Sequence, residues 1–381
     1  MAEAISHGLP HLERAEMVAV LMADRIAVCV AGCHGKSTTS GMVAFILKHA
    51  GRDPTYLIGA EVSALGDNAA PGSGPHVVVE ADEYARAFLE YSPDVALVTN
   101  VEADHLDYYG TYEAVKEAFR GFASNVKPGG TLILCANNDE AMALRDSLPE
   151  GASLITYALD LRAEYRASEV EDTSGMQHFN VYHHGELQGR YSIRLAGLHN
   201  VQNALGAFVI ARTLGLTDDE IREGLAAYTG VRRRFEYVGE AAGVLLMDDY
   251  AHHPTEVAAL AVAAHARFPG ARIVVLFQPH TYARSKYLLE GWKTCFHAFN
   301  RLFILETYAA REPLSSGLTA AQLAEHLTDP PATYCATPEA AVEALTAELK
   351  PGDVFFTVGA GDVNFVGPLL LQRLQSAGLR Q

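Results

Sequence analysis

The chain has 381 residues, 49% of them hydrophobic and 20% charged, which is enough for two domains with hydrophobic cores of their own. Its 29 basic and 46 acidic residues give a formal net charge of −17, which disfavours nucleic acid or an anionic membrane as a general partner. The segment with Glu3, Glu13 and Glu16 lacks the basic start of a signal peptide, and no apolar run approaches the roughly 18 residues of a membrane span, which predicts a cytoplasmic protein.

The first part of the chain alternates short apolar runs with amphipathic segments. This alternation predicts an α/β domain with a mainly parallel sheet, covered on both faces and holding its ligands at the carboxyl ends of the strands. Strands are predicted at 26–30, 76–80, 95–99 and 131–135, and helices at 1–24, after Lys36, at 112–123 and after Asn138.

A glycine loop joins the first predicted strand to the following helix. Backbone N–H groups of the loop and of the first helical turn point outward together, and Lys36 adds a full positive charge. The loop therefore predicts a shortened P-loop-type phosphate site, in which Ser37 or Thr38 can offer a hydroxyl to Mg²⁺. An ordinary glycine turn is the alternative. The loop residues are Gly32, Cys33, His34, Gly35, Lys36, Ser37 and Thr38.

The five cysteines are scattered without CxxC spacing, which predicts reduced thiols and no cysteine zinc site. Only Cys33 lies in a candidate site. Loop amides at a helix N-terminus should favour its thiolate, which would make it reactive. The alternative is a small residue that fills space.

The pattern changes after residue 165. Strict alternation of polar and apolar residues over 165–195, with turn signals such as His184-Gly185, predicts an antiparallel meander that forms a small side sheet on the first domain. Helices follow at 199–214 and 218–227. A boundary near 228–231 divides the chain into domains 1–229 and 230–381.

The second domain is predicted to be a Rossmann-like α/β unit. A hairpin at 235–238 and 244–247 comes first, and a helix begins after Pro254. Strands are expected at 272–276, 302–305 and 354–358.

Acidic and histidine side chains follow two strands of the first domain. Glu80, Asp82 and Glu83 come directly after one strand, and His105 comes shortly after the next. Carboxylates beside a phosphate loop are where Mg²⁺ is held in nucleotide enzymes, so we expect a metal site here. Solvated acidic residues at a helix start are the alternative for each carboxylate, and a structural role is the alternative for the histidine.

Four further clusters carry polar chemistry. Asn200 opens a helix, where it serves either as an N-cap or as a paired donor and acceptor for adenine. The run 232–234 is three arginines at the domain boundary, either solvated or closing onto phosphate. The run 248–256, DDYAHHPTE, lacks the HExxH-type spacing of zinc ligands and favours a nucleotide and substrate grip. His280 and Arg284 follow another strand and either hold a small carboxylate or belong to a surface turn.

Taken together, these motifs resemble the Mur ligases of peptidoglycan precursor synthesis, in the family's order, from about residue 5 to the C-terminus. The DDYAHHPTE and FQPHTYAR pair resembles the member that couples L-alanine. The motifs are GCHGKSTTS, EADE, TNVEADHLDYYG, GLHNVQNA, GVRRRFE, DDYAHHPTE, FQPHTYARSK and GAGD.

The resemblance implies an ATP- and Mg²⁺-dependent ligase that joins L-alanine to the lactyl carboxylate of UDP-N-acetylmuramate through an acyl phosphate. It implies that the loop holds ATP phosphates and that closure of the two domains excludes water. The implied catalytic residues are Lys36, Glu80, His105, Arg234 and His252. The implied Mg²⁺ ligands are Ser37, Glu80 and His105. The implied nucleotide contacts beyond the loop are His199, Asn200, Asn203, Arg234 and Asp249, and those to L-alanine are His252, His280 and Arg284.

The sequence also departs from the family pattern. The N-terminal domain that binds UDP has no counterpart here, so we expect a separate UDP-binding domain or chain to supply it. Sister ligases use a carboxylated lysine after the metal histidine, and neither Lys116 nor Arg120 can be assigned to that role. An ATP-binding core without ligase activity, acting as a regulatory or interaction module, is the alternative function.

Overall fold

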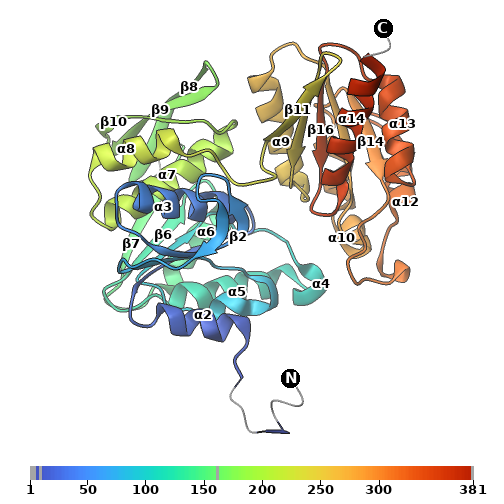
Figure 1. Ribbon diagram of the computed structural model, residues 1–381. Coiled ribbons are helices and arrows are strands. Elements are labelled where there is room, and N and C mark those ends of the chain that lie inside the picture. The colour runs from blue at the N-terminus through green and yellow to red at the C-terminus, as the bar shows by residue number, and fades with distance from the viewer. Residues whose placement is uncertain (1–5, 8–10, 160–162, 379–381) are drawn as a thin grey trace. The chain divides into compact units, whose positions relative to one another are not determined.

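A computed structural model describes residues 6–7, 11–159 and 163–378 (Figure 1). The chain forms two compact units. The first comprises the residues up to Arg194 together with His199–Val231, and the second comprises Leu195–Leu198 and the residues from Arg232 onward. Each unit is described by itself.

The first unit contains a ten-stranded sheet in the order β10-β9-β8-β7-β6-β5-β1-β4-β2-β3. In this order, every pair of neighbouring strands from β8 to β2 is parallel. This confirms the predicted α/β class with a mainly parallel sheet. The strands are β1 (Ile26–Ala31), β2 (Thr55–Val62), β3 (Asp67–Ala70), β4 (His76–Glu80), β5 (Val95–Val98), β6 (Thr131–Cys135), β7 (Ser153–Ala158), β8 (Tyr165–Thr173), β9 (Met176–His183) and β10 (Glu186–Ile193).

The predicted meander is present as the antiparallel strands β8, β9 and β10. It continues the main sheet, because β7 and β8 pair in parallel at Tyr157 with Tyr165 and at Ala158 with Arg166. The small side sheet is therefore an extension of the large one.

Helices cover both faces of this sheet. In Figure 1, α2 and α5 lie on one face, and α3, α7 and α8 lie on the other. The predicted helix 1–24 is α2 over part of its length, and residues 1–5 and 8–10 of that prediction lie outside the described residues. The helical segments are α2 (Arg14–Met22), α3 (Lys36–His49), η1 (Tyr84–Glu90), α4 (Leu106–Tyr109), α5 (Tyr112–Ser124), α6 (Asp139–Ala143), η2 (Leu144–Ser147), α7 (Leu198–Thr213) and α8 (Asp218–Ala227).

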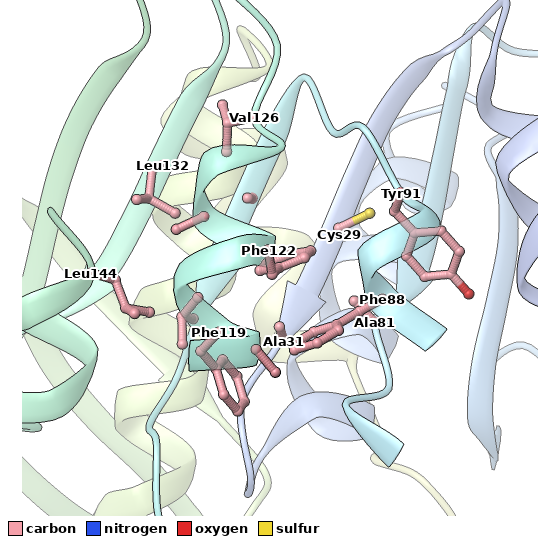
Figure 2. Close-up of a cluster of buried hydrophobic side chains, with 14 of the residues drawn as sticks. Cys29, Ala31, Ala81, Phe88, Tyr91, Phe119, Phe122, Val126, Leu132 and Leu144 are labelled. Carbon is pink, nitrogen blue, oxygen red and sulfur yellow. The ribbon is translucent and has the colours of Figure 1, made fainter. Parts of the chain in front are cut away.

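Three phenylalanines join α5 to the 3-10 helix η1 in the core of the first unit (Figure 2). Phe119 and Phe122 lie on the buried face of α5, whose apolar residues recur at helical spacing. Phe88 of η1 stacks on Phe122, with ring centroids 5.0 Å apart, and meets Phe119 edge to face at 5.1 Å. This cluster fixes η1, which begins directly after the acidic run 80–83.

The second unit contains a six-stranded sheet in the order β11-β12-β16-β13-β14-β15. The β11–β12 hairpin is antiparallel and the remaining pairs are parallel, in agreement with the predicted Rossmann-like unit. The strands are β11 (Glu236–Ala241), β12 (Val244–Asp249), β13 (Ile273–Phe277), β14 (Arg301–Leu305), β15 (Ala332–Cys335) and β16 (Val354–Val358).

Two apolar layers hold the helices of the second unit against its sheet. Residues of α9, α11 and α12 pack in one layer, and residues of α13 and α14 pack in the other. The helical segments are α9 (Pro254–Arg267), α10 (Tyr282–Tyr287), α11 (Leu289–Cys295), η3 (Leu314–Ser316), α12 (Ala320–His326), α13 (Pro338–Glu348), η4 (Val363–Phe365) and α14 (Val366–Gly378). Across the described ranges 6–7, 11–159 and 163–378, no helix is both long and apolar enough to cross a membrane.

Candidate active site

The glycine loop follows β1 and begins α3, as the sequence predicts. Gly32 and Gly35 have φ values of 134° and 82°. A Cβ at Gly32 would lie 2.0 Å from Thr99 Oγ1, and one at Gly35 would lie 2.5 Å from Asn203 Oδ1. Both positions therefore require glycine for conformation and for space. The His34 N–H donates to Asn100 Oδ1 at 2.9 Å, which ties the loop to the segment after β5.

The Lys36 side chain crosses this loop, and its ammonium group pairs with a buried carboxylate. Its Nζ donates to Gly32 O at 2.6 Å and to the Glu83 oxygens at 2.7 and 3.0 Å. Glu83 is only 1% exposed. Burial lowers the pKa of Lys36, but Glu83 and the neighbouring carboxylates outweigh burial and hold that pKa above its ordinary value. The lysine is therefore charged in the loop.

The sequence offers Glu83 only as one of three carboxylates at a metal site, and the family resemblance gives neither Asp82 nor Glu83 a role of its own. The available signal was its place as the third carboxylate of the run 80–83, and nothing in the sequence indicates which carboxylate turns toward the lysine. The Tyr109 hydroxyl also donates to the Glu83 carbonyl, at 2.5 Å. Glu83 is thus held at its backbone and at its side chain.

The predicted metal ligands fall into two groups. Ser37 Oγ donates to Glu80 Oε1 at 3.0 Å, and Glu80 Oε2 accepts the Gly59 N–H at 2.6 Å. His105 Nε2 lies 3.6 Å from Glu83 Oε1 instead. Within the part of the chain that the structure describes, His105 makes no ion pair with Glu80. Asp82, Glu83 and His105 each offer one ligand atom, and these atoms all lie within 4.8 Å of one another.

Cys33 contradicts one expectation. Its Sγ accepts the Glu102 N–H at 3.1 Å and its thiol donates to the Glu102 carbonyl at 3.4 Å. Burial, and then the charge of Glu83, raise the pKa of the Cys33 thiol well above its ordinary value. The prediction of a favoured thiolate is therefore wrong, because burial outweighs the loop amides. The alternative of a small residue that fills space fits this geometry.

The two loop hydroxyls also differ. Thr38 is 6% exposed, and its carbonyl accepts the Tyr228 hydroxyl at 3.4 Å. Only Ser37 of the pair reaches a carboxylate in the described residues. Of the two hydroxyls that the sequence offers to Mg²⁺, the geometry therefore favours that of Ser37, which contacts Glu80.

The predicted adenine contacts lie on α7. Asn203 Nδ2 donates to Asn200 Oδ1 at 3.3 Å, and both asparagines are 8% exposed. Asn203 also packs against Gly35 of the loop. His199 precedes them and is exposed. The geometry brings the asparagine pair to the phosphate loop, while adenine recognition stays a prediction.

The arginine run 232–234 has members with different partners. Arg233 donates to Asp248 Oδ2 at 2.9 Å and to the carbonyls of Gly359 and Gly361 at 2.8 and 2.9 Å. It therefore links strand ends inside the second unit. Arg234 Nη1 instead contacts Glu256 Oε1 at 3.2 Å.

Asp249 ends β12 beside this arginine. Its carboxylate accepts the N–H groups of Phe235 and Ala251, each at 2.8 Å. Burial raises the pKa of Asp249 to about 6, against the opposing effect of Arg234. Asp249 and Arg234 thus lie together, as predicted, in the second unit.

The three predicted alanine contacts also lie together in the second unit. Arg284 Nη1 lies 3.1 Å from His280 Nδ1, and the rings of His252 and His280 are 6.1 Å apart. Glu256, which the sequence reasoning did not assign, accepts the His252 N–H at 3.0 Å and is 8% exposed at its side chain. A basic cluster of this kind can hold a small carboxylate.

The two basic residues of α5 that the sequence leaves unassigned, Lys116 and Arg120, are partly exposed. Lys116 pairs with Glu113 at 2.8 Å and with Glu140 at 3.6 Å. Arg120 pairs with Glu113 and Glu117, each at 3.0 Å. Their carboxylate partners all differ from those of His105.

Comparison with known proteins identifies the family. Residues 30–211 match the model of the Mur ligase middle domain, and residues 233–361 match that of the Mur ligase, glutamate ligase domain. The UDP-N-acetylmuramate--L-alanine ligase of Geobacter sp. (strain M21) is 40% identical over 99% of this chain and 82% of its own length. That of Mycobacterium marinum is 41% identical over 98% of this chain and 78% of its own length.

A solved structure agrees with the sequence comparison. The chain superposes on the UDP-N-acetylmuramate-alanine ligase MurC from Thermotoga maritima with a TM-score of 0.82, at 25% identity, over 99% of this chain and 82% of the other. The chain therefore belongs to the Mur ligase family. Within that family it is MurC-like, and it spans about four fifths of the length of these relatives.

Proposed function

We propose that this chain joins L-alanine to the lactyl carboxylate of UDP-N-acetylmuramate, with cleavage of ATP to ADP and phosphate, in peptidoglycan precursor synthesis. The observation that carries the proposal is 40–41% identity to UDP-N-acetylmuramate--L-alanine ligases over 98–99% of the chain. The middle-domain match supports ATP as the nucleotide. We place the reaction in the cytoplasm, with no role for nucleic acid or membrane.

The geometry of the first unit supports the ATP half of this proposal. Gly32 and Gly35 let the loop backbone approach Thr99 and Asn203 closely, and Lys36 brings a positive charge to the start of α3, where phosphate is favoured. The Ser37 hydroxyl and the Glu80 carboxylate offer oxygen ligands, which suit Mg²⁺, with His105 as a further proposed ligand. Bound Mg²⁺ would neutralise charge on the transferring phosphoryl group.

The proposed reaction has two steps. A lactyl carboxylate oxygen attacks the γ-phosphorus of ATP, the bond from that phosphorus to the bridging oxygen of ADP breaks, and the acyl phosphate and ADP result. The alanine nitrogen then attacks the acyl carbon, loses a proton, and phosphate departs as the amide forms. Lys36 and the loop amides stabilise charge on the transferring group.

The remaining proposed contacts position the substrates. His199, Asn200 and Asn203 bind adenine, while Arg234 and Asp249 bind nucleotide from the second unit. The cluster of His252, His280 and Arg284 holds the carboxylate of L-alanine, with Glu256 fixing His252. We keep the division into domains 1–229 and 230–381, and a separate UDP-binding domain or chain, as parts of the proposal.

The test is release of phosphate by the purified chain. We expect release only when ATP, Mg²⁺, L-alanine and UDP-N-acetylmuramate are all present, and a loss of at least a hundredfold in Lys36→Ala, since one charge-assisted contact to a transition state accounts for roughly 3 kcal/mol. The assay is repeated after adding, as a second chain, the part of the Geobacter ligase that this chain does not cover. Tight ATP binding with no release in either assay would favour an ATP-binding core without ligase activity.

A further inference from the structure

A two-residue turn in the β-meander carries a histidine in the left-handed backbone conformation. His183 pairs with Glu186 across the β9–β10 hairpin, so only His184 and Gly185 form the loop. Their φ values are 48° and 85°. Two positive φ values are the signature of a type I′ turn, which favours Asn or Asp at the first position. His184 therefore adopts the left-handed conformation, which is uncommon for residues other than glycine.

The turn brings two imidazole rings to one carboxylate. Successive side chains of a strand point to opposite faces, but the left-handed His184 departs from that alternation. Its ring centroid lies 4.4 Å from that of His183. Glu164 Oε1 lies 3.1 Å from His183 Nε2 and 3.6 Å from His184 Nε2. All three ligand atoms lie within 4.8 Å of one another.

Neighbouring contacts fix each of these three residues. The His184 N–H donates to the Glu164 carbonyl at 2.9 Å, which continues the β8–β9 ladder to the turn. Tyr165 stacks on His183 with ring centroids 4.3 Å apart and an interplanar angle of 17°. The three side chains thus come from adjacent, hydrogen-bonded chain segments, and bringing them together requires little further ordering.

We propose that Glu164, His183 and His184 form a binding site for a divalent transition-metal ion of the Zn²⁺ class. Two imidazole nitrogens and one carboxylate oxygen are a ligand set that zinc prefers, whereas Mg²⁺ and Ca²⁺ prefer oxygen ligands. Zn–ligand distances of about 2.0–2.1 Å in a tetrahedron separate the ligand atoms by about 3.3 Å, close to the two measured distances. The His184 side chain is 68% exposed, so the fourth ligand is water.

This site is distinct from the phosphate loop. Strand β9 lies five positions from β1 in the sheet order, which corresponds to about 24 Å at a strand spacing of about 4.8 Å. A metal here links the end of β9 to the start of β8, so it stabilises the meander (Figure 1). The metal supplies no group to the ligase reaction. If the zinc site proved absent, the proposed function would be unaffected.

The test measures zinc binding by the full chain after treatment with a chelator. His184→Asn removes a ligand and installs the residue that a type I′ turn prefers, so this variant should fold at least as well as the parent. Glu164→Gln removes the carboxylate charge and keeps the size. The control is His178→Asn, which changes a histidine of β9 outside the cluster. The Asp82, Glu83 and His105 cluster is the same in all four proteins.

Equilibrium dialysis with ZnCl₂ should give one more bound zinc per chain for the parent and for His178→Asn than for the other two variants, or an affinity at least tenfold higher. Zinc should also raise the melting temperature of the parent and of His178→Asn more than that of His184→Asn. Equal stoichiometry and equal affinity in all four proteins would overturn the proposal.

Discussion

At the scale of single residues, the site depends on one buried carboxylate. Glu83 neutralises Lys36 inside the phosphate loop and holds its Nζ near the Gly32 carbonyl. The incoming phosphates must therefore share this lysine with Glu83. The Glu83 carboxylate is only 1% exposed, so water cannot take the place of Lys36 as its partner. Separating Glu83 from Lys36 is therefore costly.

Replacing Glu83 by Gln should strengthen nucleotide binding, because the loop then offers the phosphates an uncompensated positive charge. We expect the dissociation constant for ADP to fall roughly tenfold, equivalent to about 1.4 kcal/mol. Calorimetry at fixed salt measures this change. Glu117→Gln makes the same change of charge on the exposed side of α5 and should leave the constant unchanged. Weaker ADP binding in a folded Glu83→Gln protein would mean that the carboxylate positions the lysine for phosphate.

Residue-level prediction succeeded where a motif fixes the backbone. The turn from β1 into α3 could be predicted, because Gly32 and Gly35 supply the positive φ values that it requires. The partner of Lys36 could not be predicted, because Glu80 ends β4, two more carboxylates follow within three residues, and no local pattern shows which of them turns toward the lysine. The prediction of a reactive Cys33 thiolate was wrong for a similar reason, because the thiol is buried only once the loop has folded.

At the scale of elements, the stack of Phe88 on Phe122 anchors η1 beside the acidic run. Phe122→Ala should destabilise the first unit by about 3–5 kcal/mol, because it removes a fully buried ring and leaves a cavity. Urea unfolding followed by circular dichroism measures the loss. Glu117→Ala, an exposed change on the same helix, should shift the transition by less than about 0.5 kcal/mol.

The single tryptophan provides an internal control for this experiment. Trp292 lies in the core of the second unit, away from the α5 cluster. Its fluorescence transition should stay in place in Phe122→Ala, since the two units have separate cores. A circular dichroism transition that did not move would contradict the role assigned to the aromatic stack.

Strands that are continuous apolar runs could be predicted, and four strands without such a run could not. β1, β13 and β16 are nearly continuous apolar runs because both of their faces are buried. The strands absent from the prediction lack that signal. β2 is interrupted by the exposed Gly59, β3 reads Asp-Asn-Ala-Ala, β7 buries only its last two residues, and β15 is a four-residue edge. The meander was predicted by alternation, but its attachment to β7 depends on two parallel pairs that no local pattern displays.

At the scale of the whole molecule, two units divide the proposed chemistry. The first carries the phosphate loop and the acidic run, and the second carries the cluster of His252, His280 and Arg284. Each cluster lies at the carboxyl ends of parallel strands, where doubly wound sheets bind ligands. The family membership accounts for both units with one reaction.

The central claim is that ATP activates the lactyl carboxylate as an acyl phosphate, and an isotope experiment tests it most directly. UDP-N-acetylmuramate labelled with ¹⁸O in both lactyl carboxylate oxygens is incubated with the chain, the supplied UDP-binding segment, L-alanine and Mg-ATP. Mass spectrometry should find one ¹⁸O in the released phosphate and one in the amide product. Phosphate that carries no ¹⁸O while ATP is consumed would contradict the account.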